Sequence, residues 1–254
     1  MQVSSNSWLL SRAACSTVLI LTLVGCDNSA AAGGAGFEPV AAGAKVTNYV
    51  LVIRMRPEAP EKYFRQARAA YAVCTAIAKQ IKHEVTPFPV LKQDFFTERT
   101  TYASDGELTM VRRISYDLDV RNMTPENGCE LRLVKLWSTG LTGKGKVRSG
   151  DLDMDGQVHL VEAEAPPDEP VRASLLASRP QSKRINDVPL KCTVEGDCIV
   201  DPTVALIKQG FRPVLAGYRV DDIAAHGTAL IVEPISLTVG KPIDPAIFSV
   251  EKGE

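Results

Sequence analysis

The sequence lacks an excess of charge of either sign. Its 254 residues include 29 Lys and Arg side chains against 30 Asp and Glu, which gives a formal net charge of -1. A protein that binds nucleic acid needs a basic surface to displace counterions from phosphate, so this balance argues against nucleic-acid binding. The composition, 45% hydrophobic and 23% charged, also argues against a disordered, collagen-like or coiled-coil chain. The length fits one large or two small domains.

Sequence motifs of hydrolytic enzymes are also missing. The chain has no G-x-S-x-G nucleophile elbow and no H-E-x-x-H zinc motif, and we expect no cysteine free to act as a nucleophile. The three histidines, His83, His159 and His226, are far apart in the sequence. We therefore expect no enzymatic activity; a triad that the fold assembles from distant residues is the alternative.

A nucleotide site is equally unsupported. The stretch from Gly140 to Val147 comes within one residue of a phosphate-binding loop, but Val147 replaces the hydroxyl that would hold magnesium. The residues that follow read as a strand, whereas phosphate binding of this kind uses a helix N-terminus. We expect a glycine-lysine turn here and no bound nucleotide.

The N-terminus carries one short apolar run, from Ala13 to Val24, behind the single charge of Arg12. A helix needs about 20 apolar residues to cross the hydrocarbon core of a bilayer, so this run is too short for a permanent span. Its length and position are typical of a signal peptide. We predict a signal peptide over residues 1–25.

The run ends in Leu23-Val24-Gly25-Cys26, which resembles the lipobox of bacterial lipoprotein precursors. The resemblance implies cleavage before Cys26, a diacylglycerol thioether on its sulfur, and a fatty acid such as palmitate on the new amino terminus. Several acyl chains form a stable membrane anchor, since each buried methylene contributes about 0.8 kcal/mol. The alternative is an ordinary secretory signal in which Cys26 is incidental. No family is recognised for the mature domain.

The same resemblance implies a lipid-anchored protein at a bacterial cell membrane, facing the periplasm or the exterior. Asp27 slightly favours the inner membrane, because an aspartate after the lipidated cysteine is associated with retention there in enteric bacteria. Residues 26–45 begin with the lipidated cysteine and are dominated further on by alanine and glycine. Such a composition predicts a flexible tether.

Four cysteines remain once Cys15 leaves with the signal and Cys26 is lipidated: Cys74, Cys129, Cys192 and Cys198. An even number in an exported chain favours disulfides. Of the three connectivities we favour Cys74–Cys129 with Cys192–Cys198, because the second pair flanks a turn-like stretch. A zinc site is the alternative, although the five-residue spacing of the close pair is longer than zinc sites prefer.

Hydrophobic patterning predicts an α+β fold: an antiparallel meander sheet with one long amphipathic helix packed on it, and a C-terminal strand-rich part with a short helix. The long helix begins at Pro60 and carries an apolar stripe that includes Cys74. Asp201 and Gly210 bracket the short helix. Predicted strands cover residues 49–55, 107–120, 129–137, 146–153, 157–164, 213–220 and 229–239.

This pattern divides the mature chain into three parts. Residues 46–164 form the predicted α+β domain, and residues 188–254 a C-terminal β-rich part that either stands alone or continues the first sheet. The segment between them, residues 165–187, contains four prolines and no clear periodicity. We predict a long surface loop or a linker there.

One motif matches a calcium-binding EF-hand loop. Asp151, Asp153 and Asp155 are followed by Gly156, Gln157 and Glu162, with carboxylates and glycine at the spacing that such loops require. Calcium is the only cofactor that the sequence offers. The flanking sequence nevertheless leaves no room for the two helices of an EF-hand.

The alternative, which we favour, is a β-hairpin with Met154-Asp155-Gly156 as its loop and Gly156 in the left-handed conformation. Its register places Leu152 opposite Val158, Asp151 opposite His159, Arg148 opposite Glu162 and Lys146 opposite Glu164. Each pair is apolar or opposite in charge, which stabilises a ladder.

From these observations we expect a non-enzymatic, membrane-tethered lipoprotein of the cell envelope that acts by binding, as an accessory of an envelope complex or a protective partner of another protein. A carrier of an apolar, lipid-like ligand in a groove between sheet and helix is the first alternative. A calcium-binding envelope protein is the second.

Overall fold

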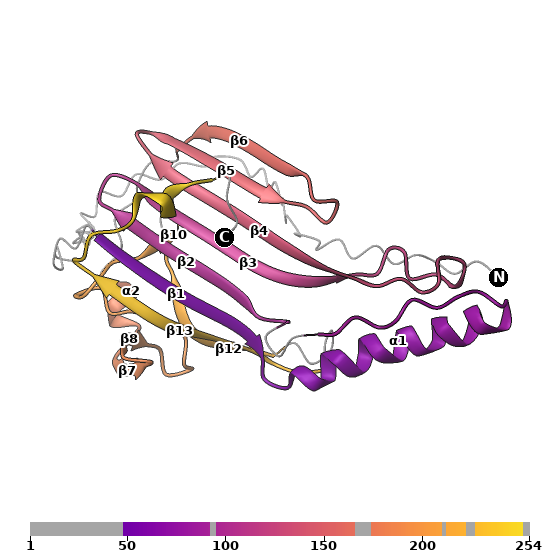
Figure 1. Cartoon of the computed structure of the whole chain (residues 1–254). Helices are drawn as coiled ribbons and strands as arrows, with labels where there is room; N and C mark the ends of the chain where they lie inside the picture. Colours follow the sequence, from indigo (N-terminus) through magenta and orange to yellow (C-terminus); the bar gives the residue numbers. More distant parts are fainter. Residues whose placement is uncertain (1–47, 92–94, 166–173, 210–211, 222–226, 251–254) are drawn as a thin grey trace, which may run out of the picture. The chain divides into compact units, whose positions relative to one another are not determined.

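The chain folds into the predicted α+β class, with one long helix and one large antiparallel sheet (Figure 1). A computed structural model describes residues 48–91, 95–165, 174–209, 212–221 and 227–250. The signal peptide, Cys26 and the predicted tether lie outside these residues.

The large sheet contains 11 strands in the order β6-β5-β4-β3-β2-β1-β13-β12-β9-β8-β7. Its N-terminal strands are β1 (Asn48–Pro57), β2 (Glu98–Asp105), β3 (Thr109–Asp119), β4 (Arg132–Gly143), β5 (Lys146–Leu152) and β6 (Val158–Glu164). Its C-terminal strands are β7 (Gln181–Ile185), β8 (Val188–Cys192), β9 (Cys198–Val200), β12 (Leu215–Val220) and β13 (Leu230–Val239). Strands β10 (Lys208–Gln209) and β11 (Arg212–Pro213) form a separate pair.

The two halves of the chain share this sheet because β13 pairs with β1 over almost its whole length. A register shift between Val52 and Ile53 interrupts the pairing once. The C-terminal strands therefore continue the first sheet, which is one of the two arrangements that the sequence left open.

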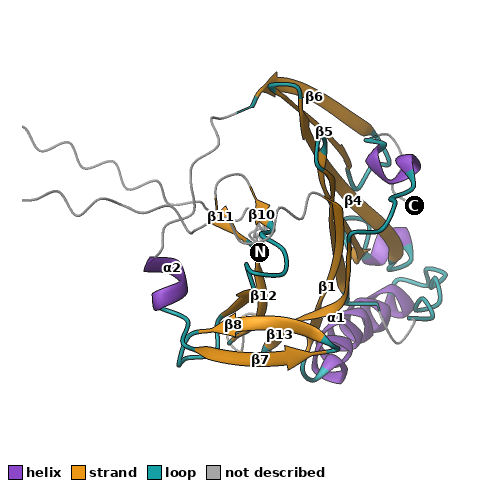
Figure 2. Ribbon diagram, turned by 90° about the vertical axis from the view of Figure 1, so that its left-hand side faces the viewer, coloured by secondary structure: helices purple, strands orange, loops and turns teal. Residues whose placement is uncertain are grey.

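The main core lies where the sheet bends, so that β7 and β8 approach the inner face of β1 and β13 (Figure 2). Alternation along β1 turns Tyr49, Leu51 and Ile53 to this inner face. They pack against buried apolar residues of the C-terminal half, namely Val188, Leu190, Cys192, Cys198, Val200, Ala205, Ile207, Val214, Ala216 and Val232. The apolar part of the inner face is thus filled by the protein's own side chains.

Helix α1 (Pro60–Gln80) is attached to the sheet through a disulfide-linked turn. Its buried residues Cys74 and Ala78 pack against Cys129, which follows the short 3-10 helix η1 (Pro125–Asn127). The helix stripe faces this turn and the segment after the helix, where Tyr71 donates a hydrogen bond to the carbonyl of Thr86. It lies at the end of the sheet instead of crossing its face (Figure 1).

Both predicted disulfides are present, Cys74–Cys129 and Cys192–Cys198. The first joins residues 55 apart in the sequence, and closing a loop of that length in the unfolded chain contributes about 4 kcal/mol of stability. The second links two opposite residues of β8 and β9.

The C-terminal segment lies on the outer face of the sheet. After β13 the chain forms the short 3-10 helix η2 (Pro245–Phe248), and Ile247, Phe248 and Val250 pack on a small cluster from β2, β3 and β4. Arg112 of β3 is buried beneath it and donates hydrogen bonds to the carbonyl oxygens of Ile247 and Ser249, at 3.2 and 2.6 Å. These contacts hold the segment on the sheet.

The prediction of a short helix between Asp201 and Gly210 is wrong. Residues 202–204 form a single turn that the Asp201 carboxylate caps at the backbone of Thr203, and the chain then extends into β10. Ala205 and Ile207 are buried in the main core at a two-residue spacing, which an extended chain satisfies and a helix does not. Core packing therefore overrides the capping signal.

Two further features differ from the expectations. Strands β2, β8, β9 and β10 have no counterpart among the predicted strands. The segment predicted as loop or linker over residues 165–187 contains a short helix, α2 (Ser174–Ala177), and strand β7, which pairs with β8.

Candidate functional site: the β5–β6 hairpin

The β5–β6 hairpin has the predicted register. Leu152 lies opposite Val158, Asp151 opposite His159, Arg148 opposite Glu162 and Lys146 opposite Glu164. Gly156 has φ +76°, the left-handed conformation that the three-residue loop requires. The turn is closed by backbone hydrogen bonds between Asp153 and Gln157 and between Gly156 and Asp153.

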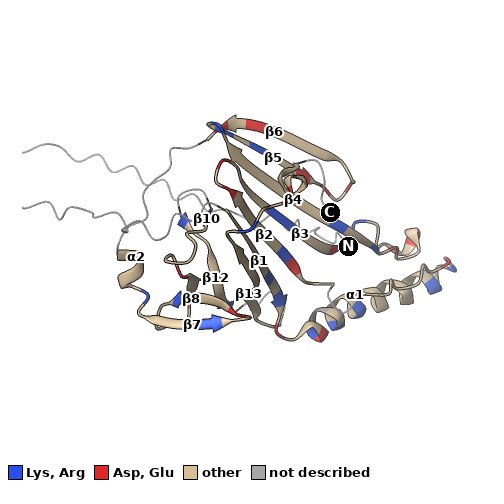
Figure 3. Ribbon diagram, turned by 60° about the vertical axis from the view of Figure 1, so that its left-hand side comes forward, with Lys and Arg blue, Asp and Glu red and all other residues tan. Residues whose placement is uncertain are grey.

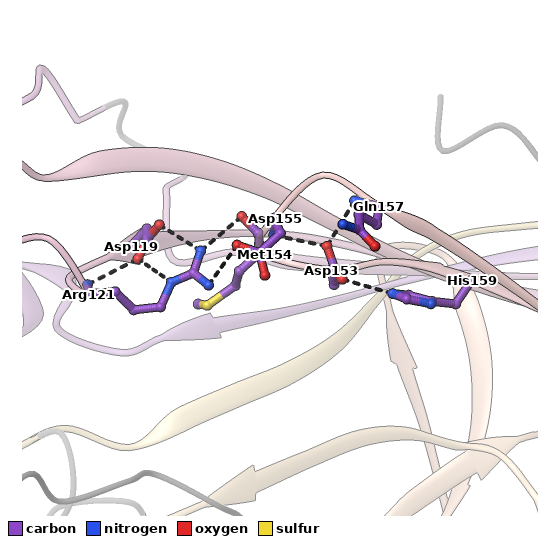
Figure 4. Close-up of polar contacts among 7 residues, drawn as sticks. All are labelled: Asp119, Arg121, Asp153, Met154, Asp155, Gln157 and His159. Carbon is purple, nitrogen blue, oxygen red and sulfur yellow. Dashed lines mark hydrogen bonds and ion pairs between the residues drawn. The ribbon is translucent and has the colours of Figure 1, made fainter.

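Asp153 organises the tip of this hairpin (Figure 4). One carboxylate oxygen accepts hydrogen bonds from the backbone N–H groups of Asp155 and Gln157, both at 2.9 Å. The other lies 2.8 Å from Nε2 of His159. The hydrogen bond from His159 lowers the pKa of Asp153, and the same bond raises the pKa of His159.

Arg121, which follows β3, links the tip to the end of β3, although β4 separates β3 from β5 in the sheet (Figure 4). Its Nε and Nη2 atoms donate to the two oxygens of Asp119, each at 2.9 Å, while Nη1 donates to Asp155 at 2.8 Å. Nη2 also reaches the carbonyl of Met154 at 3.2 Å. The Arg121 side chain is the main cause of the lowered pKa of the buried Asp119 carboxyl. No pattern in the sequence predicts this contact, because Arg121 and Asp155 are 34 residues apart.

The carboxylates of the calcium-like motif do not converge on one point. Asp153 is bound to His159, Asp155 to Arg121, and Glu162 to Lys146 of the adjacent strand, an interaction that lowers the pKa of Glu162. Within the part of the chain that the structure describes, no group of three or more His, Cys, Asp or Glu side chains is arranged to hold a metal ion.

Two side-chain partners differ from the expected pairs. His159 contacts Asp153 instead of the directly opposite Asp151, and Glu162 contacts Lys146 instead of Arg148. In both cases the side chain reaches a residue two positions along from its direct partner, which strand geometry allows for long side chains.

Strand β6 forms one edge of the large sheet, and among the described residues it pairs only with β5. All seven of its residues are exposed. Val158, Leu160 and Val161 are exposed by 49, 55 and 60%. Leu160 and Val161 point to opposite faces of the sheet, so apolar surface flanks the open edge on both sides.

The remaining candidates are dispersed. His83 is exposed just beyond α1, Asp221 forms an ion pair with Arg219, and His226 lies outside the described residues. The phosphate-loop-like stretch covers the end of β4, the β4–β5 turn and the start of β5, so it leads into a strand and not into a helix. Cys26 also lies outside the described residues.

Two shallow grooves open beside α1. One, of about 590 Å³, is lined by Glu61, Phe64, Arg65, Arg68 and Ala69. The other, of about 450 Å³, is lined by Arg68, Tyr71, Phe88, Pro89, Val90 and Leu91. None of these lining residues belongs to a strand, so neither groove is the groove between sheet and helix that the lipid-carrier alternative requires.

Comparison with known proteins gives no relatives: no protein-family model, no curated protein and no solved structure matches this chain. The fold defines a disulfide-containing α+β domain. Its two disulfides are typical of a domain that folds outside the cytoplasm. None of the helices in the described part of the chain is long and apolar enough to cross a membrane.

Proposed function

We propose that this protein is a membrane-tethered lipoprotein of the bacterial cell envelope that binds another envelope protein by accepting a strand of that protein at the β6 edge. The lipobox-like sequence before Cys26 supports the tether. The disulfides support the compartment. The exposed edge of β6 is the observation that carries the binding function.

An edge strand presents unpaired backbone N–H and C=O groups, and proteins usually protect such edges with short strands, bulges or charges. Strand β6 has seven residues, and its register with β5 contains no shift. Its charged side chains, Glu162 and Glu164, are confined to the C-terminal end, which leaves the stretch from Val158 to Val161 apolar apart from His159. Such an edge is suited to pair with an extended segment of a partner.

The charges of β6 indicate the chemistry of that segment. Lys146 is bound to Glu162, and Glu164 has no ion-pair partner among the described residues. A basic side chain of the partner would satisfy Glu164, while apolar side chains would cover Leu160 and Val161. A second copy of the same strand would bring further acidic groups to this edge, so a different protein with a basic and apolar strand fits better.

The lipid-carrier alternative receives no support from the inner face. Leu51, Tyr102 and their neighbours there are buried against Val188, Leu190 and Ile207. A ligand in that position would have to displace a packed core.

A photo-crosslinking amino acid placed singly at Leu160 and at Val161 tests the binding function in cells that express the full chain. Because these side chains point to opposite faces, a strand added at the edge is expected to crosslink the same partner from both positions. A partner that docks on one face would crosslink from only one, and that result would contradict strand addition. Val194, exposed by 72% in the β8–β9 turn, is the matched control position.

A second experiment places charged side chains on the β6 edge. The double variant Val158→Lys and Leu160→Lys leaves buried residues untouched and is expected to remove the crosslink from Val161, since charge on an edge opposes strand pairing. A crosslink that persists in this variant would reject the β6 edge as the binding site.

The tether is tested separately by labelling with palmitate. Label is expected in the wild-type protein and not in Cys26→Ala. Equal incorporation into both proteins would remove the lipoprotein assignment without affecting the β6 result.

A further inference from the structure

Helix α1 and its C-terminal cap carry a second apolar stripe that the rest of the described chain leaves open. Val73, Ile77 and Ile81 follow one another at four-residue spacing, which places them on one side of the helix. They are exposed by 64, 44 and 49%. The buried stripe, with Cys74 and Ala78, is a separate one that contacts Cys129.

The polar surface of the same helix is basic. Residues 60–80 contain four basic side chains, Lys62, Arg65, Arg68 and Lys79, against the single acidic Glu61, and Lys82 lies two residues beyond the helix (Figure 3). An exposed apolar stripe beside a basic surface is typical of helices that lie in the interface of a membrane. The basic side chains attract anionic lipid head groups.

The attachment of α1 fixes which side it presents. The Cys74–Cys129 disulfide and the hydrogen bond from Tyr71 to Thr86 hold one side of the helix against the turn. Arg68 is held over the ring of Phe88, with 5.7 Å between the guanidinium carbon and the ring centre. These contacts prevent the helix from rotating its exposed stripe inward, so solvent or an external surface must meet it.

We infer that α1 lies on the surface of a bilayer that contains anionic lipid, with Val73, Ile77 and Ile81 in the interface and the basic side chains at the level of the phosphates. The inference rests on the proposed function only for the tether that brings a membrane within reach. Twenty-one residues separate Cys26 from Asn48, so even a fully extended chain keeps β1 within about 75 Å of an anchor at Cys26.

Quenching by brominated lipids tests this contact in the full chain. The variant Ile77→Trp places an indole in the stripe, and Val194→Trp places one at a more exposed site far from α1 in the sequence. Of the two native tryptophans, Trp8 lies in the predicted signal peptide, whereas Trp137 is buried and supplies a constant background. The vesicles consist of phosphatidylcholine alone or of an equal mixture with phosphatidylglycerol, each with and without brominated acyl chains.

The indole at position 77 is expected to lose most of its emission with brominated vesicles that contain phosphatidylglycerol, and less at high salt or with phosphatidylcholine alone. The indole at position 194 is expected to keep its emission. Charge reversal by Lys62→Glu with Arg65→Glu should remove the dependence on phosphatidylglycerol, whereas Lys183→Glu on the exposed surface of β7 should not.

Absence of quenching at position 77 in both lipids would overturn the inference, as would equal quenching at positions 77 and 194. Quenching that ignores phosphatidylglycerol would overturn the role of the basic side chains. Flotation of the wild-type protein with phosphatidylcholine vesicles reports the lipid anchor independently. If the wild-type protein fails to float but the indole at position 77 is quenched by vesicles that contain phosphatidylglycerol, the proposed tether is contradicted and the helix contact is supported.

Discussion

Arg121 donates a hydrogen bond of 2.8 Å to Asp155, and thereby joins the end of β3 to the tip of the β5–β6 hairpin. The same guanidinium makes two bonds to the buried carboxylate of Asp119. One side chain therefore anchors the hairpin that presents the exposed β6 edge. A residue outside the hairpin thus adds to the pairing of β5 with β4 in holding the hairpin on the sheet.

Replacement of Arg121 by alanine should destabilise the domain by about 1–3 kcal/mol, because the Asp119 carboxylate would remain buried without its strongest donor. Urea denaturation of the full chain measures this loss. The control Asp155→Ala removes only the exposed half of the contact and should cost less than about 1 kcal/mol. Equal losses of unfolding free energy in the two variants would show that burial of the Asp119 carboxylate does not account for the effect of Arg121.

The contact between His159 and Asp153 should make the hairpin sensitive to pH. The folded pKa of His159 is raised above its ordinary value by the Asp153 carboxylate. The charged pair is therefore fully stabilising below about pH 6.5, the unfolded value of histidine, and its contribution is lost as the pH rises through the higher folded pKa. At acidic pH the contribution is also lost as the pH falls through the lowered pKa of Asp153.

An NMR titration of the His159 ring tests this directly. Asp153→Asn should lower the pKa of His159, because the hydrogen bond to a carboxylate is its largest cause. Asp151→Asn is the control and should change it less, since Asp151 contributes only a weaker electrostatic interaction. An unchanged pKa in Asp153→Asn would contradict the contact.

Local pattern was enough to predict the backbone of the hairpin. Gly156 favours a turn, and the alternation of side chains in the two flanking strands determines which residues face one another. The side-chain partners were less predictable, because Lys146 and His159 reach across diagonals. The role of Arg121 was not predictable at all, since its two partners are brought together only by the folded sheet.

In the C-terminal half, a local sequence pattern led to a wrong prediction. Asp201 does cap a turn, as its position predicted, but Ala205 and Ile207 are drawn into the core against β1. A helix there would have turned one of them away from that core. The sequence pattern contains no information about the core surface that these residues pack against. The capping signal at Asp201 therefore predicted a helix where the chain forms only one turn.

Calcium at millimolar concentration should leave the melting temperature of the wild-type protein unchanged. The carboxylates of Asp153, Asp155 and Glu162 already bind His159, Arg121 and Lys146, in three separate directions. A calcium ion would have to break these contacts before it gained its own ligands. Differential scanning fluorimetry with calcium and with a chelator measures the shift. A stabilisation by calcium that disappears in Asp153→Asn would restore the calcium-binding alternative.

Replacement of Gly150 by alanine should release the C-terminal segment from the outer face of the sheet. A Cβ atom at this position of β5 would lie 2.7 Å from the carbonyl oxygen of Val250 and 2.9 Å from a methyl group of Leu160. Overpacking of this kind costs about 1–3 kcal/mol, and the segment can avoid it by moving away. Faster proteolytic removal of the residues after β13, followed by mass spectrometry, reports the release. Gly140→Ala on β4 is the matched control, because a Cβ there meets no atom within 4 Å. Equal proteolysis of the two variants would show that the segment is not held at Gly150.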